Sequence, residues 1–190
     1  QKSMFGLLFN QKNREKRRHA QIAAQLYGQA LTQTRRETFY TEYGVPDSFD
    51  GRFDLLLVHV FIILHNLMGD DAYEDLSQAL FDVTFKDMDQ TLREMGIGDM
   101  GVPKHMKRMM KAFNGRMHSY QLAMSPDSVP PDVLPEGVVH GSMEEALRRN
   151  LYGTVENGGE QLASDIAKMI GYVQSSVEKA DVEDIKQGRI

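Results

Sequence analysis

The sequence contains no cysteine and no tryptophan, and only six of its 190 residues are proline. Without cysteine, the chain can form no disulfide bond, no thiolate metal site and no cysteine nucleophile. A chain of this length does not need such cross-links. It buries enough apolar surface to fold as one compact domain, or as one main domain with a smaller appendage.

Long apolar runs are also absent. The longest, residues 55–64, is interrupted by His59 and falls far short of the roughly 20 residues that cross a bilayer. The first apolar run, residues 4–9, has neither the basic residues before it nor the cleavage site after it that define a secretory signal. We therefore expect no membrane span and no secretory signal.

The motifs of common enzyme classes are missing as well. The chain has no G-x-x-x-x-G-K-[ST] phosphate loop, no G-x-S-x-G nucleophile elbow and no H-E-x-x-H zinc helix. Residues 96–101 contain three glycines, as a dinucleotide-binding turn does, but that turn follows a strand, and here a helix is expected before it. These glycines instead predict a tight helix-to-helix connection with positive φ angles. No arrangement of residues specifies a reaction.

Helical patterns recur along the chain, whereas no segment alternates polar and apolar residues as a strand does. Gly28 is expected to end or kink the first helical stretch, and the glycines and the proline of residues 43–52 predict a loop. Residues 53–68 are apolar on nearly all sides and predict a central buried helix. The expected helices cover residues 15–27, 30–40, 53–68, 72–93, 104–124, 143–152 and 159–177.

These patterns predict an all-α fold, a single irregular helical bundle around a central apolar helix. Four segments are expected along it. They are a basic and apolar N-terminal segment (1–14), a helical core (15–124), a loop with four of the six prolines (125–142), and C-terminal helices that pack on the core (143–190).

The net charge of −5 is unevenly distributed. Residues 1–42 hold eight Lys/Arg against three Asp/Glu, a local charge of +5, and the rest holds 14 against 24, a charge of −10. The densest basic part directly follows the first apolar run. This pairing suits an adaptor resting on anionic lipid headgroups or on ribosomal RNA, but also a solvated helix start. The candidate membrane or ribosome contacts are Phe5, Leu7, Leu8, Lys12, Arg14, Lys16, Arg17 and Arg18.

Eight of the twelve methionines fall between Met88 and Met124. Because methionine is unbranched and polarisable, a surface lined with it adapts to varied apolar partners. The alternative interpretation is that the same stripe is core. As a surface, its candidate client-binding residues are Phe81, Phe85, Met88, Met106, Lys107, Arg108, Met110, Lys111, Phe113 and Met117.

A group of carboxylates allows a different interpretation, a small helical enzyme with a divalent ion. No histidine spacing supports it, and calcium loops alternate their oxygen ligands around a glycine, which a helix does not provide. We expect these acids to cap turns or to pair with nearby Lys and Arg, and we expect no metal site. The carboxylates are Asp82, Asp87, Asp89 and Glu94.

Two histidines lie on the central apolar helix. His59 and His65 are six residues apart and therefore do not share one helix face, as positions four or seven apart would. This favours core histidines hydrogen-bonded to the backbone over ligands of haem or of a metal.

Three segments together resemble a known family. They are residues 39–54, which include Tyr-Gly-Val-Pro-Asp-Ser-Phe-Asp-Gly-Arg-Phe-Asp at 43–54, residues 80–89, and residues 92–99. In this order they resemble the ubiquinol-cytochrome c chaperone family. The resemblance covers residues 21–120 and is expected to end before residue 125. The motif positions, expected to be structural, are Pro46, Asp47, Asp50, Gly51, Arg52, Asp87, Asp89, Arg93, Glu94, Gly96, Gly98 and Asp99.

The resemblance implies an all-helical, non-enzymatic chaperone without a cofactor, which binds newly made cytochrome b and supports assembly of ubiquinol-cytochrome c reductase, the bc1 complex. In mitochondria such a chaperone works in the matrix with a small partner protein near the ribosomal tunnel exit. The N-terminus here lacks the Arg- and Ser-rich pattern of a transit peptide. We therefore expect a bacterial, alphaproteobacterial member in the cytoplasm, at the inner face of the membrane. The expected partners are cytochrome b or another apolar client, a small partner protein, and an anionic membrane or a ribosome, but not DNA.

Overall fold

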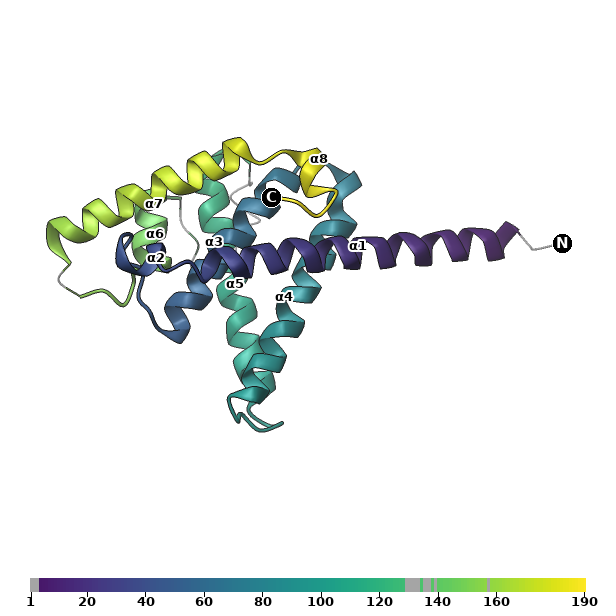
Figure 1. Ribbon diagram of the computed structural model, residues 1–190, viewed down its shortest axis with the longest axis horizontal. Helices are drawn as coiled ribbons and strands as arrows, with labels where there is room; N and C mark the ends of the chain where they lie inside the picture. The colour runs from purple at the N-terminus through teal and green to yellow at the C-terminus, as the bar shows by residue number, and fades with distance from the viewer. Residues whose placement is uncertain (1–3, 129–133, 135–137, 139, 157) are drawn as a thin grey trace.

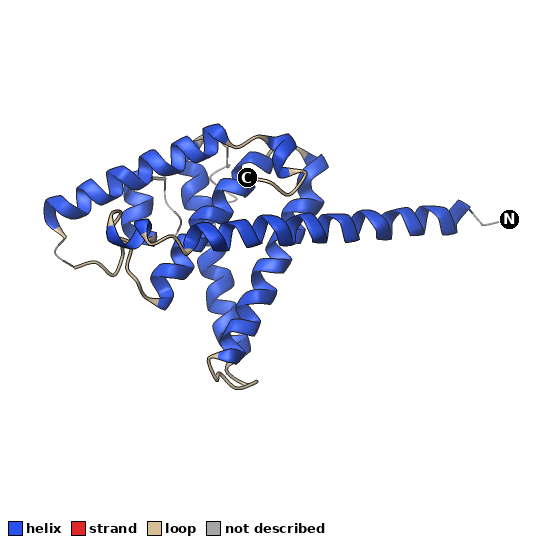
Figure 2. Ribbon diagram, in the orientation of Figure 1, coloured by secondary structure: helices blue, strands red, loops and turns tan. Residues whose placement is uncertain are grey.

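The computed structural model describes residues 4–128, 134, 138, 140–156 and 158–190 (Figure 1). Within this part of the chain every regular element is a helix and no strand is present (Figure 2). The predicted all-α fold is therefore confirmed. The helices are α1 (Met4–Thr34), α2 (Thr38–Thr41), α3 (Phe49–Leu67), the short 3₁₀ helix η1 (Asp71–Tyr73), α4 (Glu74–Glu94), α5 (Val102–Met124), α6 (Met143–Asn150), α7 (Gly159–Lys179) and α8 (Val182–Ile185).

Helix α3 begins four residues earlier than the expected central helix, because Ser48 caps it. The Ser48 hydroxyl accepts a hydrogen bond from the Gly51 backbone N–H at 3.0 Å, which satisfies one of the free donors at a helix start. Asp50 in the first turn also suits the positive end of the helix dipole. Residues 49–52, expected to be loop, are thus helical.

The central position of α3 is confirmed by its burial on all sides. Leu57 and Ile63 belong to a first apolar cluster, formed mainly with α1, α4 and α5. Val58 and Phe61 belong to a second cluster, formed mainly with α6 and α7. Because successive residues of a helix point about 100° apart, one apolar helix can supply two cores at once.

Helix α1 is longer than expected and passes through Gly28 without ending. The expected end at Gly28 is wrong. A glycine inside a helix costs only about 1 kcal/mol, and Leu26, Tyr27 and Ala30 on either side of it are buried in the first cluster. The helix expected over residues 30–40 is instead the end of α1 and the separate turn α2. In Figure 1 the N-terminal half of α1 extends away from the rest of the molecule.

Helices α4 and α5 form an antiparallel pair that projects from the body as an arm (Figure 1). The connection at its tip, residues 95–101, turns through Gly96, whose φ is 83°. L side chains rarely adopt this angle, so the positive φ expected in this glycine-rich connection is present at Gly96. Pro103 lies in the first turn of α5, where its missing N–H costs nothing.

The C-terminal helices cover the second cluster. Ser142 and Glu145 form a capping box that starts α6, and Leu147 and Ile166 bury their side chains from α6 and α7. The short helix α8 was not among the helices expected from the sequence, and Asp181 caps it. Residues 129–133, 135–137 and 139 of the expected Pro-rich loop lie outside the described residues. Among the helices described, none is long and apolar enough to cross a membrane.

Candidate functional site: the α4–α5 arm

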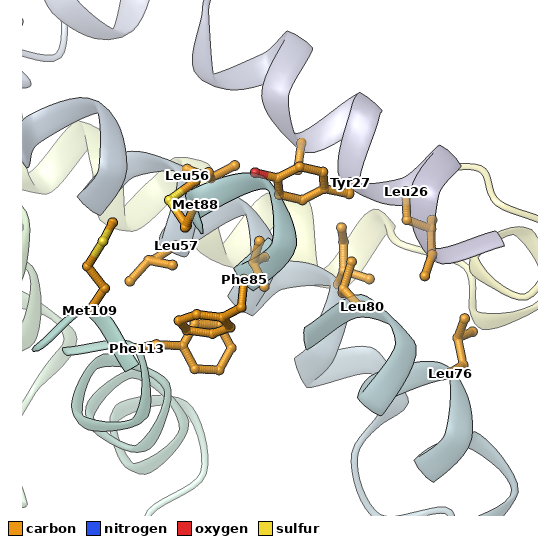
Figure 3. Close-up of a cluster of buried hydrophobic side chains, with 14 of the residues drawn as sticks. Leu26, Tyr27, Leu56, Leu57, Leu76, Leu80, Phe85, Met88, Met109 and Phe113 are labelled. Atoms are coloured by element: carbon orange, nitrogen blue, oxygen red, sulfur yellow. The ribbon is translucent and has the colours of Figure 1, made fainter. Parts of the chain in front are cut away.

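The aromatic and methionine stripe of the arm lies largely in the first apolar cluster. Phe85, Met88 and Phe113 are all buried there, and the rings of Phe85 and Phe113 pack edge to face with centroids 5.3 Å apart. Figure 3 shows Phe85 and Phe113 packed together, with Leu57 of α3 nearby, and Met88 beside Leu56 and Tyr27. For these three candidate client-binding residues the structure therefore supports the core interpretation.

Three other candidates are half-buried. Phe81, Met106 and Met117 pack against the same cluster. Met109, which the sequence did not single out, is buried with them (Figure 3). Met106, Met109, Phe113 and Met117 thus form one apolar face of α5 that packs in the core, whereas Met110 lies outside it.

The exposed apolar side chains of the arm lie elsewhere, at its tip and on its outer face. Met100 is 97% exposed and Met95 55% exposed in the connection between the two helices, and Met110 is 39% exposed on α5. Sequence reasoning missed Met95 and Met100 because it searched for helical periodicity. The available signal was an apolar residue inside a glycine-rich turn, where no core is within reach. The large exposed apolar residues of the described chain are Phe49, Met68, Met95, Met100, Met110 and Ile190.

The two helices of the arm differ in charge. Helix α5 carries five Lys/Arg and no Asp/Glu, whereas α4 carries six Asp/Glu and two Lys/Arg. Lys107 and Lys111 are exposed beside Met110. Arg108 is exposed as well, but it lines a cavity together with Ala112 and Arg116. Arg108 is three positions from Lys111, so the two lie on neighbouring parts of the α5 surface, and Arg108, Ala112 and Arg116 form the part that faces the cavity.

The four carboxylates considered for a metal site are each engaged separately. Asp87 accepts a hydrogen bond from the Tyr27 hydroxyl at 2.6 Å, which ties α1 to α4. Asp89 pairs with Arg93 at 3.0 Å, as expected for these acids. In the described residues no three His, Asp or Glu side chains come together as a metal site would require. Asp82 accepts a hydrogen bond from Gln78 and Glu94 accepts one from Gln90, each at 2.8 Å. Of the four acids, Asp89 alone makes the expected pair with a Lys or Arg among the described residues.

His59 is the centre of a buried polar network in the body. Its Nδ1 lies 3.0 Å from both the Leu55 carbonyl and the Thr34 hydroxyl, and its Nε2 lies 2.9 Å from the Tyr172 hydroxyl. Burial lowers its pKa to about 4, because a charged imidazolium loses its hydration there. The expected backbone-bonded core histidine is confirmed for His59. His65 instead faces a side chain, with its Nδ1 2.7 Å from Oε1 of Gln121.

The residues that resemble the family motif lie at two places, around the first turn of α3 and at the tip of the arm. A Cβ at Gly51 would lie 2.0 Å from the Pro46 carbonyl oxygen, so only glycine fits there. Asp47 and Arg52 pair at 2.7 Å, and the Arg52 guanidinium lies 5.5 Å from the centre of the Tyr40 ring. At the arm, Arg93 bridges Asp89 and Asp99, which fixes the connection next to Gly96 and Gly98. Asp50 is exposed in the first turn of α3.

The basic segment of α1 lies on the half of the helix that extends from the body. Lys12, Arg14, Lys16, Arg17 and Arg18 are all exposed. The side chains of Phe5, Leu7 and Leu8 lie outside the described residues. The basic residues are therefore open to a partner, and the role predicted for them stays a prediction.

Comparison with known proteins identifies the family. The model of the ubiquinol-cytochrome C chaperone family matches residues 41–186. The chain belongs to this family. It also matches the crystal structure of a Cbp3 homolog from Brucella abortus, with a TM-score of 0.70 and 28% identity, over 96% of this chain and 94% of that one. Among curated proteins none matches the chain significantly.

The extent of the family match revises one expectation. The resemblance was expected to end near residue 120, but the match continues through α6 and α7 to residue 186. The expected end is therefore wrong. Sequence reasoning missed this part because the described residues of α6 and α7 carry helix caps and core positions rather than a rare local motif. Membership of this family supports a chaperone role for the chain.

Proposed function

We propose that this protein is a non-enzymatic chaperone that binds an apolar segment of newly made cytochrome b and supports assembly of the bc1 complex. The client face is the tip and outer side of the arm, formed by Met95, Met100, Met110, Lys107 and Lys111. The observation that carries the proposal is the exposure of three large apolar side chains on one projecting element. The family match supports the general role.

The chemistry of this face suits a client that must later be released. Flexible methionine side chains adapt to different apolar segments, and burying apolar surface gains roughly 25 cal/mol per Å² before the costs of association are subtracted. A small patch with three methionines therefore gives moderate affinity. Lys107 and Lys111 speed encounter with acidic groups of a client and make capture sensitive to salt.

The buried residues of the arm have a supporting role in this proposal. Phe85 and Phe113 hold α4 against α5 and keep the tip in place, and Met88 is buried in the same cluster. They reach a client only if the two helices separate. The client face consequently differs from the stripe expected from the sequence, and it is reached without unfolding any core.

The proposal is tested by capture of newly made cytochrome b in cell-free translation. The double substitution Met95→Ser and Met100→Ser is expected to reduce capture about tenfold or more, which corresponds to roughly 1.4 kcal/mol, with an unchanged unfolding curve. The matched control is Met68→Ser, since Met68 is 52% exposed but lies outside the arm. Full capture by the double variant, or equal loss in the control, would place the client site elsewhere.

The cellular role has its own test. Membranes of a strain without this protein are expected to lose the b-type and c-type haem absorption of the bc1 complex and cytochrome b on immunoblots, while an unrelated membrane protein is unchanged. Normal haem and cytochrome b levels would show that the role in bc1 assembly does not apply to this chain. If the expected loss occurs, the Met95/Met100 double variant should fail to restore the deletion strain, whereas the Met68 variant should restore it.

A second function is favoured by the exposed basic residues on the extended half of α1. There the protein acts as an adaptor that holds the arm near a membrane surface or a ribosome through residues 5–18. Removing the chain before Glu15 is expected to release the protein from membranes or ribosomes while leaving capture in dilute solution intact. If release does not occur, the basic segment is a solvated helix start.

A further inference from the structure

A cavity of about 400 Å³ lies on the body, away from the methionines of the arm tip. Three segments far apart in the sequence form it: the first turn of α3, one face of α5, and the end of α6 with the turn that follows. Its volume lies within the range of small-molecule sites. Nothing in the chaperone role described above uses it.

The polar wall of the cavity is predominantly cationic. Arg116 pairs with Asp54 at 2.8 Å, and both side chains are largely covered, with 21% and 14% exposure. This pair is electrically neutral overall. Arg108 and Arg149 also line the cavity and are exposed to solvent, as is one further acid, Asp50, so three arginines face two aspartates and the lining has a net charge of +1. The cavity therefore offers two guanidinium groups beyond the internal ion pair, which suits an anionic group.

The remaining wall is apolar. Phe49 lines the cavity and is 41% exposed, so part of its ring is accessible to a ligand. Phe53, which is half-buried, and Met109 and Leu151, which are buried, line the cavity as well. A ligand that binds the arginines therefore places its other end against apolar side chains.

The backbone holds these walls in position. At Gly51 an added Cβ would lie 2.0 Å from the Pro46 carbonyl oxygen, and at Gly153 it would lie 2.5 Å from the Arg149 carbonyl oxygen. Both contacts are with backbone, which cannot move aside as a side chain can. Both contacts are local, one between Pro46 and the first turn of α3 and one between the end of α6 and the turn after it, so they constrain the backbone within each of these two walls. A site formed in advance in this way saves the ligand the cost of ordering it.

We infer that this cavity binds a small anionic amphiphile, a molecule with one carboxylate or phosphate head on Arg108 and Arg149 and an apolar body against Phe49 and Phe53. Asp54 limits the affinity, because its carboxylate occupies Arg116. Removal of the Asp54 charge makes a third guanidinium available to the ligand. The site is separate from the client face, since Lys107, Met110 and Lys111 do not line it.

Titration calorimetry on the full chain tests the inference with three probes of one chain length. Dodecanoate and dodecyl phosphate, below their micellar concentrations, are expected to bind one to one in roughly the micromolar range, and uncharged dodecanol at least tenfold more weakly. Tighter binding of dodecanoate would identify a fatty-acid-like carboxylate, and tighter binding of dodecyl phosphate a lipid-type phosphate. Equal binding of dodecanol, or no binding of either anion, would overturn the inference.

Matched variants locate the site. Arg149→Gln is expected to weaken binding of both anions about tenfold, whereas Arg148→Gln, its neighbour on α6, should have no effect, because Arg148 pairs with Glu144 and does not line this cavity. Asp54→Asn should strengthen binding several-fold, a gain that misfolding does not produce. If Arg148→Gln weakens binding as much as Arg149→Gln, or Asp54→Asn fails to strengthen it, the anions bind elsewhere and the assignment is wrong.

Discussion

The two sides of α3 hold different kinds of core. On the side of α7, His59 and Tyr172 close a polar network whose ring nitrogens and hydroxyl are all hydrogen-bonded. Phe39 packs edge to face against both rings. On the side of the arm, the buried phenylalanine and methionine side chains pack through apolar contacts and form no hydrogen bonds with one another. A satisfied buried network specifies one arrangement, whereas methionine tolerates several. Because each cluster buries two methionines, the hydrogen-bonded network is what distinguishes the two sides, and we expect the side of α7 to be the more rigid one.

Truncation of one phenylalanine in each region tests this difference most strongly. Phe61→Ala, in the second cluster, is expected to lower the free energy of unfolding by about 3–5 kcal/mol, because the fully buried ring leaves a cavity. Phe81→Ala, on the half-buried side of the arm, should cost under about 2 kcal/mol. Urea unfolding of both variants measures this. Equal losses would mean that the arm is as tightly packed as the body.

The network of the body should also make stability depend on pH. The pKa of His59 is about 4 in the folded chain and 6.5 ordinarily, so the unfolded chain binds the proton first as the pH falls. The wild type therefore loses up to about 3 kcal/mol between pH 7 and pH 4 from this group. Burial raises the pKa of Asp54 to about 7, which acts in the opposite direction.

A difference measurement isolates the histidine from Asp54. His59→Gln should be less stable than the wild type at pH 8, but it should lack this proton uptake, so the gap between the two proteins narrows by about 3 kcal/mol at pH 4. His140→Gln, at an exposed position, serves as the control and should run parallel to the wild type. A constant gap for His59→Gln would contradict a neutral, buried His59.

The link between α1 and the arm is expected to have a smaller effect. Tyr27→Phe removes the hydroxyl that donates to Asp87, and hydrogen bonds to charged groups contribute about 1.5–3 kcal/mol. Since this pair is only partly buried, we expect a loss of about 1–2 kcal/mol by urea unfolding. Tyr43→Phe is the comparison, because the Tyr43 hydroxyl has no hydrogen bond among the described residues. The same loss in both variants would show that the Asp87 contact is unimportant.

The tip of the arm is expected to contribute least to stability. Met100→Ser removes a side chain that is 97% exposed and should change the free energy of unfolding by less than about 0.5 kcal/mol. The same variant should increase solubility slightly, since it removes an exposed apolar group. A loss above about 1 kcal/mol in calorimetric unfolding would mean that Met100 packs against other residues in solution.

Much of the fold could be predicted from the sequence, and less of the site. Helices α3, α4 and α5 were predicted to within about four residues at each end, because their apolar spacing is local information. The predicted end of the first helix at Gly28 was wrong, because burial of the residues around Gly28 outweighs the weak helix propensity of glycine. The sequence showed the methionine-rich stripe on α5, but it could not show which of its residues face the core and which face solvent. Lys107 and Arg108 are adjacent in sequence, but Arg108 lines a cavity and Lys107 does not. This difference depends on how α3 and α6 pack against α5.

The sequence by itself determined the helical class, the central place of residues 53–67 and the family, because apolar periodicity and a long ordered motif need no tertiary contact to be recognised. The tertiary structure alone decided which methionines are buried and which are exposed, since that depends on what α1 and α3 cover. It also brought Phe49, Arg116 and Arg149 to one cavity. These residues come from three helices, and no local pattern predicts the approach of segments that are 33 to 100 positions apart.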